Sequence, residues 1–561
     1  MTAGGRWLSI GIAHPVHGRV ELTTMAPFSA DRFEQSDVRA YRASLADPAR
    51  ASFGFDLLDA DPGTVTLALD SFPSAIVERK EARLESIVVA PPGRSGAVQL
   101  VRIAAKTALR GPAWSGQPRL ARAEYTQLTL GGRLPRAPTD NRVSWEQRVG
   151  WDETVYLIDD RALGASAAIV APYVEIGAGT SAAAVFAVAL GHDAAPVMAE
   201  ARELAREAVH LQSDAATERR RVWNGAERTS WYTRRALAYA IDCAASRSGD
   251  VVAMLADHQI LPLVWTRDAY YVCRMLLAAG IRAPVEGFLR WMFETAERVD
   301  GWWPRASLAS GKLKDPAFQL DQQVWPLILL ADHARLTGDA SLLARHEREA
   351  RRVLDALLAR RGAAGLIATD ETPADDPLTH PYHFSSHVLL WRALRMFAHP
   401  QAVAVRSVVV RRFKSRGRFA YAINDGGDAL HYHDANDLPT VFAPGWGFCT
   451  AGDALWRGTI AFAWTGENPG YFAGRFGGLG SVHTPHPWPL GDLQEIVLAR
   501  AMKEPQRERR AHERLERVET WDGLLPEAYD ETSGAVASRH WFAWPAALRA
   551  LLEMEPMLTA P

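Results

Sequence analysis

The sequence contains little cysteine. Only three occur among 561 residues, Cys243, Cys273 and Cys449, and none belongs to a Cys-x-x-Cys pair. Such a sparse and odd-numbered set excludes a disulfide framework and a zinc site built on cysteine pairs. It is typical of a reducing compartment, so we expect a cytoplasmic protein.

Long apolar runs and a surplus of one charge are also absent. No run of about 18 apolar residues occurs, so no membrane span is expected, and residues 1–15 lack the pattern of a secretory signal. Lys and Arg number 63 and Asp and Glu 65, which gives a net charge of −2. This balance argues against a general nucleic-acid binder. We expect neither a nucleic acid nor a membrane as partner, and the oligomeric state stays open.

Several cofactor and nucleophile motifs are missing. His433 to Asp437 reads His-Asp-Ala-Asn-Asp, but without further histidines at ligand spacing it favours a hydrogen-bonding network over zinc. The glycine-rich loop 477–486 lacks the ending of a phosphate-binding loop, and no convincing Gly-x-Ser-x-Gly elbow occurs. We therefore expect no metal and no cofactor.

Tryptophan is abundant instead. The chain has 19, and 15 of them lie between Trp223 and Trp544. Interspersed with Asp, Glu and His, these rings suit a sugar-binding cleft, since flat indoles stack on pyranose faces. A large helical core rich in tryptophan is the alternative.

The chain changes character twice along its length. Short alternating segments separated by Gly, Pro and Asp predict an N-terminal β-sandwich over residues 1–195. Its expected strands are 7–13, 19–24, 64–69, 97–103, 125–130, 154–158 and 182–190. Residues 196–227, rich in Ala, Glu and Arg, predict a helical linker.

Helical periodicity dominates the third region, 228–561. Twelve segments fit helices: 231–247, 268–280, 283–298, 319–337, 340–360, 384–397, 401–414, 435–443, 452–464, 489–503, 505–519 and 540–553. Polar and aromatic residues gather in long connections between them. The pattern predicts a ring of six helical hairpins, an (α/α)6 barrel, and the whole chain an α+β multidomain protein.

Four loops of this region carry candidate chemistry. Asp268, in Trp-Thr-Arg-Asp, is either a helix N-cap or, with Arg267, a ligand for sugar hydroxyls. The adjacent carboxylates Asp375 and Asp376 form either a surface turn or a pair with one raised pKa. Glu527 follows an apolar turn, where an isolated carboxylate is costly. The basic and aromatic cluster around Arg539 is either a buried helix start or part of the same site.

The order of these motifs resembles the inverting (α/α)6-barrel glycosidases, namely glycoside hydrolase family 125, which comprises exo-α-mannosidases, and its relatives the glucoamylases. The resemblance covers about the last 330 residues and lies in segments 265–268, 372–376, 434–436, 468–472, 478–483 and 539–544. Leu-Leu-Pro-Glu at 524–527 looks more like a glucoamylase than a mannosidase. A β-domain before the barrel is likewise similar to bacterial glucoamylases.

The resemblance implies a two-carboxylate mechanism. Asp375 is the implied general acid and Glu527 the general base, although Asp376 stays open as the acid. The implied sugar-binding residues are Trp265, Arg267, Asp268, Asp376, Asp434, Asn436, His483, Arg539 and Trp541. We expect an exo-acting inverting α-glycosidase, with α-mannosides as first choice and a glucoamylase-like α-glucosidase as alternative. A non-catalytic sugar-binding protein on the same fold is the rival of another class.

Overall fold

A computed structural model describes residues 5–24, 52–55, 64–68, 72–91, 93–112, 114–124, 140–147, 153–223, 229–258, 260–520 and 523–555. The chain divides into two compact units. Met1–Arg228 with Ser246–Ser248 forms the first unit, and Thr229–Ala245 with Gly249–Pro561 forms the second. The expected strand 125–130 lies outside the described residues.

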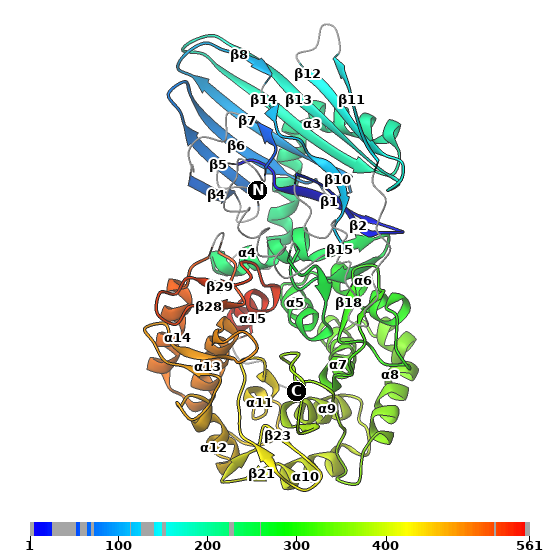
Figure 1. The fold of residues 1–561 in the computed structure, drawn as a ribbon, viewed down its shortest axis with the longest axis vertical. Helices are drawn as coiled ribbons and strands as arrows, with labels where there is room; N and C mark the ends of the chain where they lie inside the picture. Colours follow the sequence, from blue (N-terminus) through cyan, green and yellow to red (C-terminus); the bar gives the residue numbers. More distant parts are fainter. Residues whose placement is uncertain are drawn as a thin grey trace. The chain divides into compact units, whose positions relative to one another are not determined.

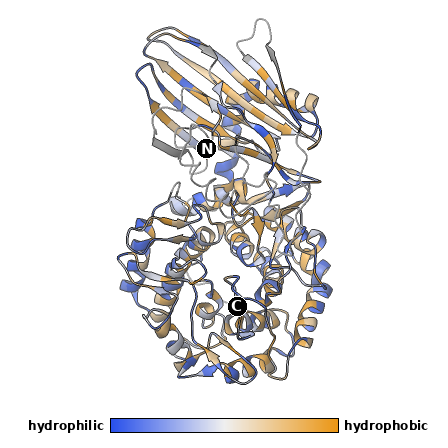
Figure 2. Ribbon diagram, in the orientation of Figure 1, coloured by the Kyte–Doolittle hydropathy of each residue, from blue (hydrophilic) through white to orange (hydrophobic). Residues whose placement is uncertain are grey.

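The first unit is built on a nine-stranded antiparallel sheet (Figure 1). Its strands, in spatial order, are β11 (Asn141–Gln147), β12 (Glu153–Asp160), β13 (Ala165–Ile176), β14 (Ser181–Gly191), β7 (Gly96–Ala105), β6 (Ala82–Val89), β5 (Phe72–Glu78) and β4 (Thr64–Ala68), and β8 (Leu109–Pro112) also pairs with β13. Alternate residues of β6 are buried, as Leu84 between exposed Arg83 and Glu85 illustrates. Figure 2 shows such alternation of hydropathy along the strands.

Smaller sheets pack on one face of the large sheet. β1 (Ser9–His14), β2 (Gly18–Thr23) and β10 (Arg119–Arg122) form one, and β3 (Gly54–Phe55) and β9 (Trp114–Ser115) pair as another. Val20 and Leu22 of β2 share a buried core with Ile169 of β13 and Phe186 of β14. The sheet of β1, β2 and β10 therefore packs against the large sheet through a shared cluster of buried side chains.

The helix that we expected as a linker belongs to the first unit. It is α3 (Ala194–Trp223), and its residues Val197, Ala201, Leu204 and Ala208 lie on one face at helical spacing. That face packs on the large sheet, against side chains such as Val98 and Val170. The charged residues that suggested a linker are the other face of this packed helix.

The described residues of the second unit form twelve α-helices. They are α4 (Trp231–Tyr239), α5 (Thr266–Ala278), α6 (Ala283–Arg290), α7 (Leu320–Thr337), α8 (Ser341–Ala359), α9 (Phe384–Met396), α10 (Ala402–Arg412), α11 (Leu438–Phe442), α12 (Ala454–Ala463), α13 (Pro489–Met502), α14 (Pro505–Arg517) and α15 (Ala543–Met554). Helical segments continue as π-turns at Ala240–Ala244 and Trp291–Thr295. The predicted helices are thus present, with α4, α6 and α11 shorter than expected.

The odd-numbered helices form a closed inner ring (Figure 1). Each of α5, α7, α9, α11, α13 and α15 contacts the next, and α15 returns to α5. The inner α5 is buried on almost all sides, whereas the outer α8 buries one stripe that includes Leu342, Ala350 and Leu357. This is the arrangement of six helical hairpins that the periodicity predicts.

The candidate residues lie in loops at one end of this ring. Trp265, Asp375, Asn436, His483 and Glu527 all precede the first residue of an inner helix. Because each inner helix is followed by an outer helix that returns, the inner helices run in the same direction. Their amino ends therefore meet at one mouth of the barrel.

No helix in the described ranges is both long enough and apolar enough to cross a membrane.

Gly491 allows α13 to approach the strand that leads into the His483 loop. A Cβ at this position would collide with the backbone carbonyl of Leu479 in β26 (Gly478–Ser481). We predict that Gly491→Ala destabilises the second unit by about 1–3 kcal/mol, because the helix must shift away. Thermal melting measures the loss. Gly466→Ala, which would meet no atom within 4 Å, is the matched control, and equal melting of both variants would contradict the packing argument.

Candidate active site

Trp265, Arg267 and Asp268 are buried at the start of α5. The helix begins at Thr266, with Trp265 at the N-cap position and no side-chain cap. Asp268 is therefore in the first turn and is not the N-cap, which removes that structural explanation for its presence.

The guanidinium of Arg267 joins three loops. Its Nη1 donates to Asp321 at 3.0 Å and to Gln319 at 3.3 Å, and its Nη2 lies 3.5 Å from Asp375. Its other side faces the ring of Trp544, 5.4 Å from the ring centre. Burial lowers the pKa of Arg267, but the charges of Asp321, Asp375 and Asp268 outweigh it and raise the pKa. The arginine is thus held in its charged form.

The carboxyl of Asp268 is electrostatically unusual. Its pKa is raised to about 7, chiefly by burial and also by the negative charges of Asp375 and Glu527, although the positive charges of Arg267 and Arg539 lower it. Its Oδ1 is buried without a hydrogen-bond partner and lies 3.6 Å from Arg267 Nε. A buried carboxylate oxygen without a partner is a position where a ligand hydroxyl would supply the missing bond.

Asp375 is fixed in a specific orientation. Its oxygens accept hydrogen bonds from Trp265 Nε1 at 3.0 Å and from Gln319 Nε2 at 2.7 Å. Its backbone has φ 64°, in the left-handed region. Such conformations gather at functional sites, where the surroundings compensate their cost.

The neighbouring Asp376 faces another loop. Its Oδ1 lies 2.9 Å from Nδ1 of His483, and both side chains are partly exposed. The hydrogen bond from His483 to this carboxylate raises the pKa of the histidine, and the charges of Asp375 and Glu527 act in the same direction. The two adjacent aspartates therefore have different surroundings.

Glu527 lies opposite a second buried arginine. Its Oε2 accepts from Ser538 Oγ at 2.6 Å, and its Oε1 lies 3.3 Å from Arg539 Nε. Arg539 has φ 40° and faces the ring of Trp265, 5.7 Å from its centre. The segment thereby connects the Glu527 loop with the start of α5.

Trp541, Asp434 and Asn436 occupy the flanks of this cluster. The Trp541 ring packs against His258 at 5.1 Å. Asp434 Oδ1 accepts from the side chain of Asn436 at 2.7 Å, and its Oδ2 accepts from Tyr432 at 2.5 Å. Tyr432 in turn accepts from the backbone N–H of Val482. The hydrogen bonds of this pair thus lead to the His483 loop rather than to Asp375 or Glu527.

Sequence reasoning missed three polar residues of the site, Gln319, Asp321 and Glu371. Gln319 Nε2 donates both to Asp375 and to Glu371, the latter at 3.0 Å. Oε1 of Glu371 also accepts a hydrogen bond from Nη1 of Arg305 at 2.9 Å. Gln319 and Asp321 stand at the start of α7, the same relative position as Trp265 to Asp268 before α5. The repeated position at an inner-helix start is the signal that would have found them.

One group in the described part of the chain has ligand atoms close enough for a metal ion. His486, Asp530 and Glu531 place one such atom each within 4.8 Å of the others. His486 Nδ1 already lies 2.9 Å from Glu531, and Asp530 Oδ1 accepts from Ser533 N at 2.7 Å. Hydrogen bonds within the cluster and to Ser533 therefore account for these side chains.

Comparisons with known proteins agree with the resemblance seen in the sequence. Residues 390–552 match the family model of the metal-independent alpha-mannosidases, GH125. An uncharacterized glycosyl hydrolase of Methanocaldococcus jannaschii is 31% identical over 114 residues, which is 20% of this chain and only 18% of that relative. The similarity to glycoside hydrolases is therefore confirmed for residues 390–552.

Solved structures extend the likeness in fold. A bacterial glucoamylase complexed with acarbose aligns with 89% of this chain and 86% of its own, at 12% identity and a TM-score of 0.59. A metal-independent α-mannosidase of Streptococcus pneumoniae, in a non-productive complex with α-1,6-mannobiose, aligns with 60% of this chain and 97% of its own, at 17% identity and a TM-score of 0.49. The glucoamylase comparison confirms a glucoamylase-like (α/α)6 barrel in a chain that also contains strands.

The raised pKa of Asp268 predicts a pH dependence of stability. A carboxyl with a pKa of 3.8 in the unfolded chain and about 7 in the folded protein takes up a proton on folding between these values. Its stabilising contribution is full below pH 3.8 and is lost as the pH rises through 7. We predict that the Tm of Asp268→Asn rises relative to the Tm of the wild type as the pH increases from 4 to 8.

Melting curves of the two proteins across this range provide the measurement. Asp250→Asn is the control, because that side chain is 84% exposed and the variant should follow the wild type. Parallel Tm curves for Asp268→Asn and the wild type would show that burial does not raise the pKa of this carboxyl.

Proposed function

We propose that the second unit is an exo-acting, inverting α-glycosidase that removes single sugars from non-reducing ends, with α-mannosides as substrates. The observation that carries this proposal is the cluster of Asp268, Asp375 and Glu527 with two buried arginines at one mouth of the barrel. The family match supports mannosides. The glucoamylase-like fold supports α-glucosides as the second candidate.

The proposed reaction uses two carboxyl groups on opposite sides of the glycosidic bond. Asp375 donates a proton to the leaving oxygen. Glu527, whose Oε2 accepts from Ser538, takes a proton from the attacking water. The family match includes Glu527 but begins after Asp375, so the acid rests on its position beside Trp265 and Arg267.

The remaining site residues are proposed to bind the terminal sugar. Asp268 offers its unpartnered oxygen to a hydroxyl, and Arg267 and Arg539 donate to neighbouring hydroxyls. Trp265 and Trp541 supply ring faces, Asp376 and His483 form a paired hydroxyl ligand, and Asp434 and Asn436 line the same terminal-sugar subsite.

The other parts of the proposal follow from the first unit and from composition. The two strand layers with a shared core support a β-sandwich. The small number of cysteines, three in 561 residues, supports a cytoplasmic location. An oligosaccharide or glycoside is the proposed partner.

We predict that Asp375→Asn and Glu527→Gln fail in different ways. Asp375→Asn should lose about 10²–10⁴-fold in kcat/KM on alkyl glycosides, which need a protonated leaving group, and much less on activated aryl glycosides. Glu527→Gln should be poor on both, since water activation is lost for every leaving group. Kinetics on paired substrates measure this.

Asp376→Asn is the matched control for the choice within the pair. If it shows the leaving-group dependence instead, Asp376 is the acid. Full activity of either Asp375→Asn or Glu527→Gln would refute the mechanism.

The stereochemistry gives an independent prediction. Inversion releases a β-sugar first from an α-linked substrate, and it needs about 6.5–9.5 Å between the carboxyl groups so that water fits. NMR of the first product from α-mannobiose and from maltose tests the anomer and the sugar preference together. An α-anomer appearing first, or oligosaccharides as first products, would contradict inversion or exo action. Thermal stabilisation by sugars without any turnover would favour a binding protein.

We also predict that chelation leaves turnover intact, because neither proposed proton transfer involves a metal. Activity is measured before and after dialysis against EDTA. Loss of activity that one added metal ion restores would give His486, Asp530 and Glu531 a functional role.

A further inference from the structure

A hollow lies in the barrel unit at the carboxyl ends of the inner helices α7 and α9. It has a volume of about 480 Å³ and is lined by the last turns of α7 and α9 and by the segment after α11. The candidate active site lies at the amino ends of the same helices. The two sites are therefore at opposite mouths of the ring.

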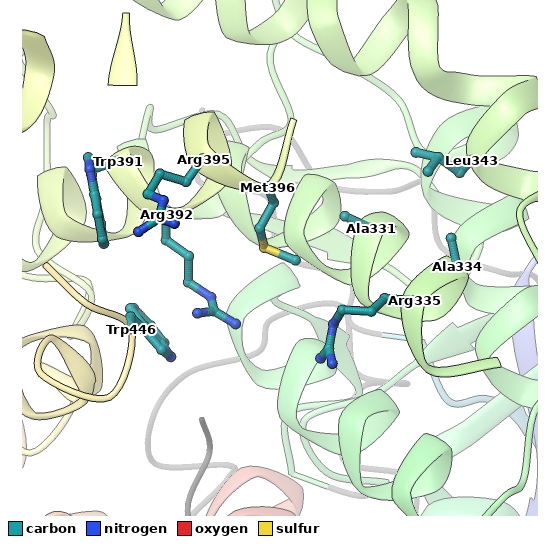
Figure 3. A pocket seen from close by; sticks show the side chains of 9 residues that line it. All are labelled: Ala331, Ala334, Arg335, Leu343, Trp391, Arg392, Arg395, Met396 and Trp446. Atoms are coloured by element: carbon teal, nitrogen blue, oxygen red, sulfur yellow. The ribbon is translucent and has the colours of Figure 1, made fainter. Parts of the chain in front are cut away.

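Three arginines line this hollow (Figure 3). Arg335 and Arg395 are exposed, and Arg392 is only 6% exposed. Figure 3 shows the guanidinium groups of Arg392 and Arg335 pointing into the space. The remaining lining is two indole rings, Trp391 and Trp446, and small or apolar side chains.

The charge of Arg392 interacts with Asp332 through space but has no direct ion pair among the described residues. Its guanidinium stacks on Trp446, 4.4 Å from the ring centre, and its buried Nε has no hydrogen-bond partner. Among the described residues, no carboxylate pairs directly with Arg392 or Arg395. Burying a charge without a partner is costly, so the position is better explained by a ligand that completes it.

The neighbouring charges leave a positive surplus. Asp332 forms an ion pair with Arg335 at 2.9 Å, and the charges of Arg274 and Arg392 lower its pKa. Arg274 also forms an ion pair with Glu555 at 2.7 Å. Together with Arg395, which lines the hollow, this set holds four guanidinium groups and two carboxylates. A surplus of two positive charges suits a dianion, and a phosphate monoester carries about −1.5 to −2 charges at neutral pH.

The apolar walls indicate that the anion has an organic part. A hollow of this size is in the range of small-molecule sites, about 300–1,000 Å³, and exceeds what a phosphate ion alone would fill. Guanidinium groups bind phosphate oxygens in bidentate fashion, and indole rings cover an apolar or pyranose face.

We propose that this hollow binds a phosphorylated small molecule of monosaccharide size, with Arg335, Arg392 and Arg395 on the phosphate and Trp446 beside the organic part. The proposal does not depend on the reaction at the other mouth of the barrel.

Isothermal titration calorimetry in a phosphate-free buffer tests the proposal. The probes are mannose 6-phosphate, glucose 6-phosphate and inorganic phosphate, with mannose as the neutral counterpart. We expect saturable binding of a sugar phosphate, weaker binding of inorganic phosphate, and affinities that fall as salt increases. Arg335→Gln and Arg395→Gln should each weaken binding about tenfold, since charge-assisted bonds are the stronger class.

Two controls separate this site from other causes. Arg411→Gln removes an exposed arginine of α10 outside the hollow and should leave the Kd unchanged. Glu527→Gln should also leave it unchanged, whereas a phosphate bound at the candidate active site would respond to the lost negative charge. Because Arg335 and Arg395 are exposed, their variants should fold even if Arg392→Gln does not.

Absence of saturable binding by all three phosphates would overturn the proposal. So would equal affinity of the Arg335→Gln, Arg395→Gln and Arg411→Gln variants, or a Kd that changes with Glu527→Gln alone.

Discussion

The buried guanidinium of Arg267 is the group on which the candidate site depends. It belongs to the first turn of α5, bonds to Asp321 in the first turn of α7, and lies beside Asp375 in the loop before α9. Three consecutive inner helices are thereby joined at their amino ends through one side chain. The desolvation cost of burying this charge is offset only because several carboxylates surround it. Conversely, Asp321, Asp375 and Asp268 can lie so close together only because Arg267 is there. Removing the arginine would leave buried negative charges facing one another, which costs more than the loss of a single ion pair.

The ring of helices was predictable because its cause is local. Apolar residues at helical spacing in each segment specify a helix, and the alternation of almost wholly buried helices such as α5 with one-sided helices such as α8 specifies inner and outer layers. The loops could be found because polar and aromatic residues interrupt that pattern. The packing of α3 against the large sheet was not predictable in the same way. Its charged face resembles a solvated linker, and its apolar face, with Val197, Ala201 and Leu204, becomes informative only when the sheet that it covers is known.

The candidate site was predictable in its residue types but not in its internal pairing. Trp265, Arg267, Asp268, Asp375, Glu527 and Arg539 are brought together as expected. Sequence could not show that Asp375 accepts from Gln319 or that Asp376 pairs with His483, because these partners are 56 and 107 positions away. Nor could the sequence show that the oxygens of Asp434 accept hydrogen bonds from Asn436 and Tyr432.

The balance of charge in the site fits the proposed reaction in a way that single contacts do not show. Asp268, Asp321, Asp375 and Glu527 face Arg267 and Arg539, so the cluster is negative when all four carboxyls are ionised. Burial is the main cause of the raised pKa of Asp268, and the charges of Asp375 and Glu527 also raise it. A sugar ring acquires positive charge in the transition state of glycoside hydrolysis, and groups fixed in advance around that charge stabilise it more than flexible water can. The same repulsion that makes the empty site costly would therefore be relieved most when the ring is most positive. The unfavourable free energy of holding these carboxylates together would then lower the activation barrier for hydrolysis, rather than tighten the binding of the substrate.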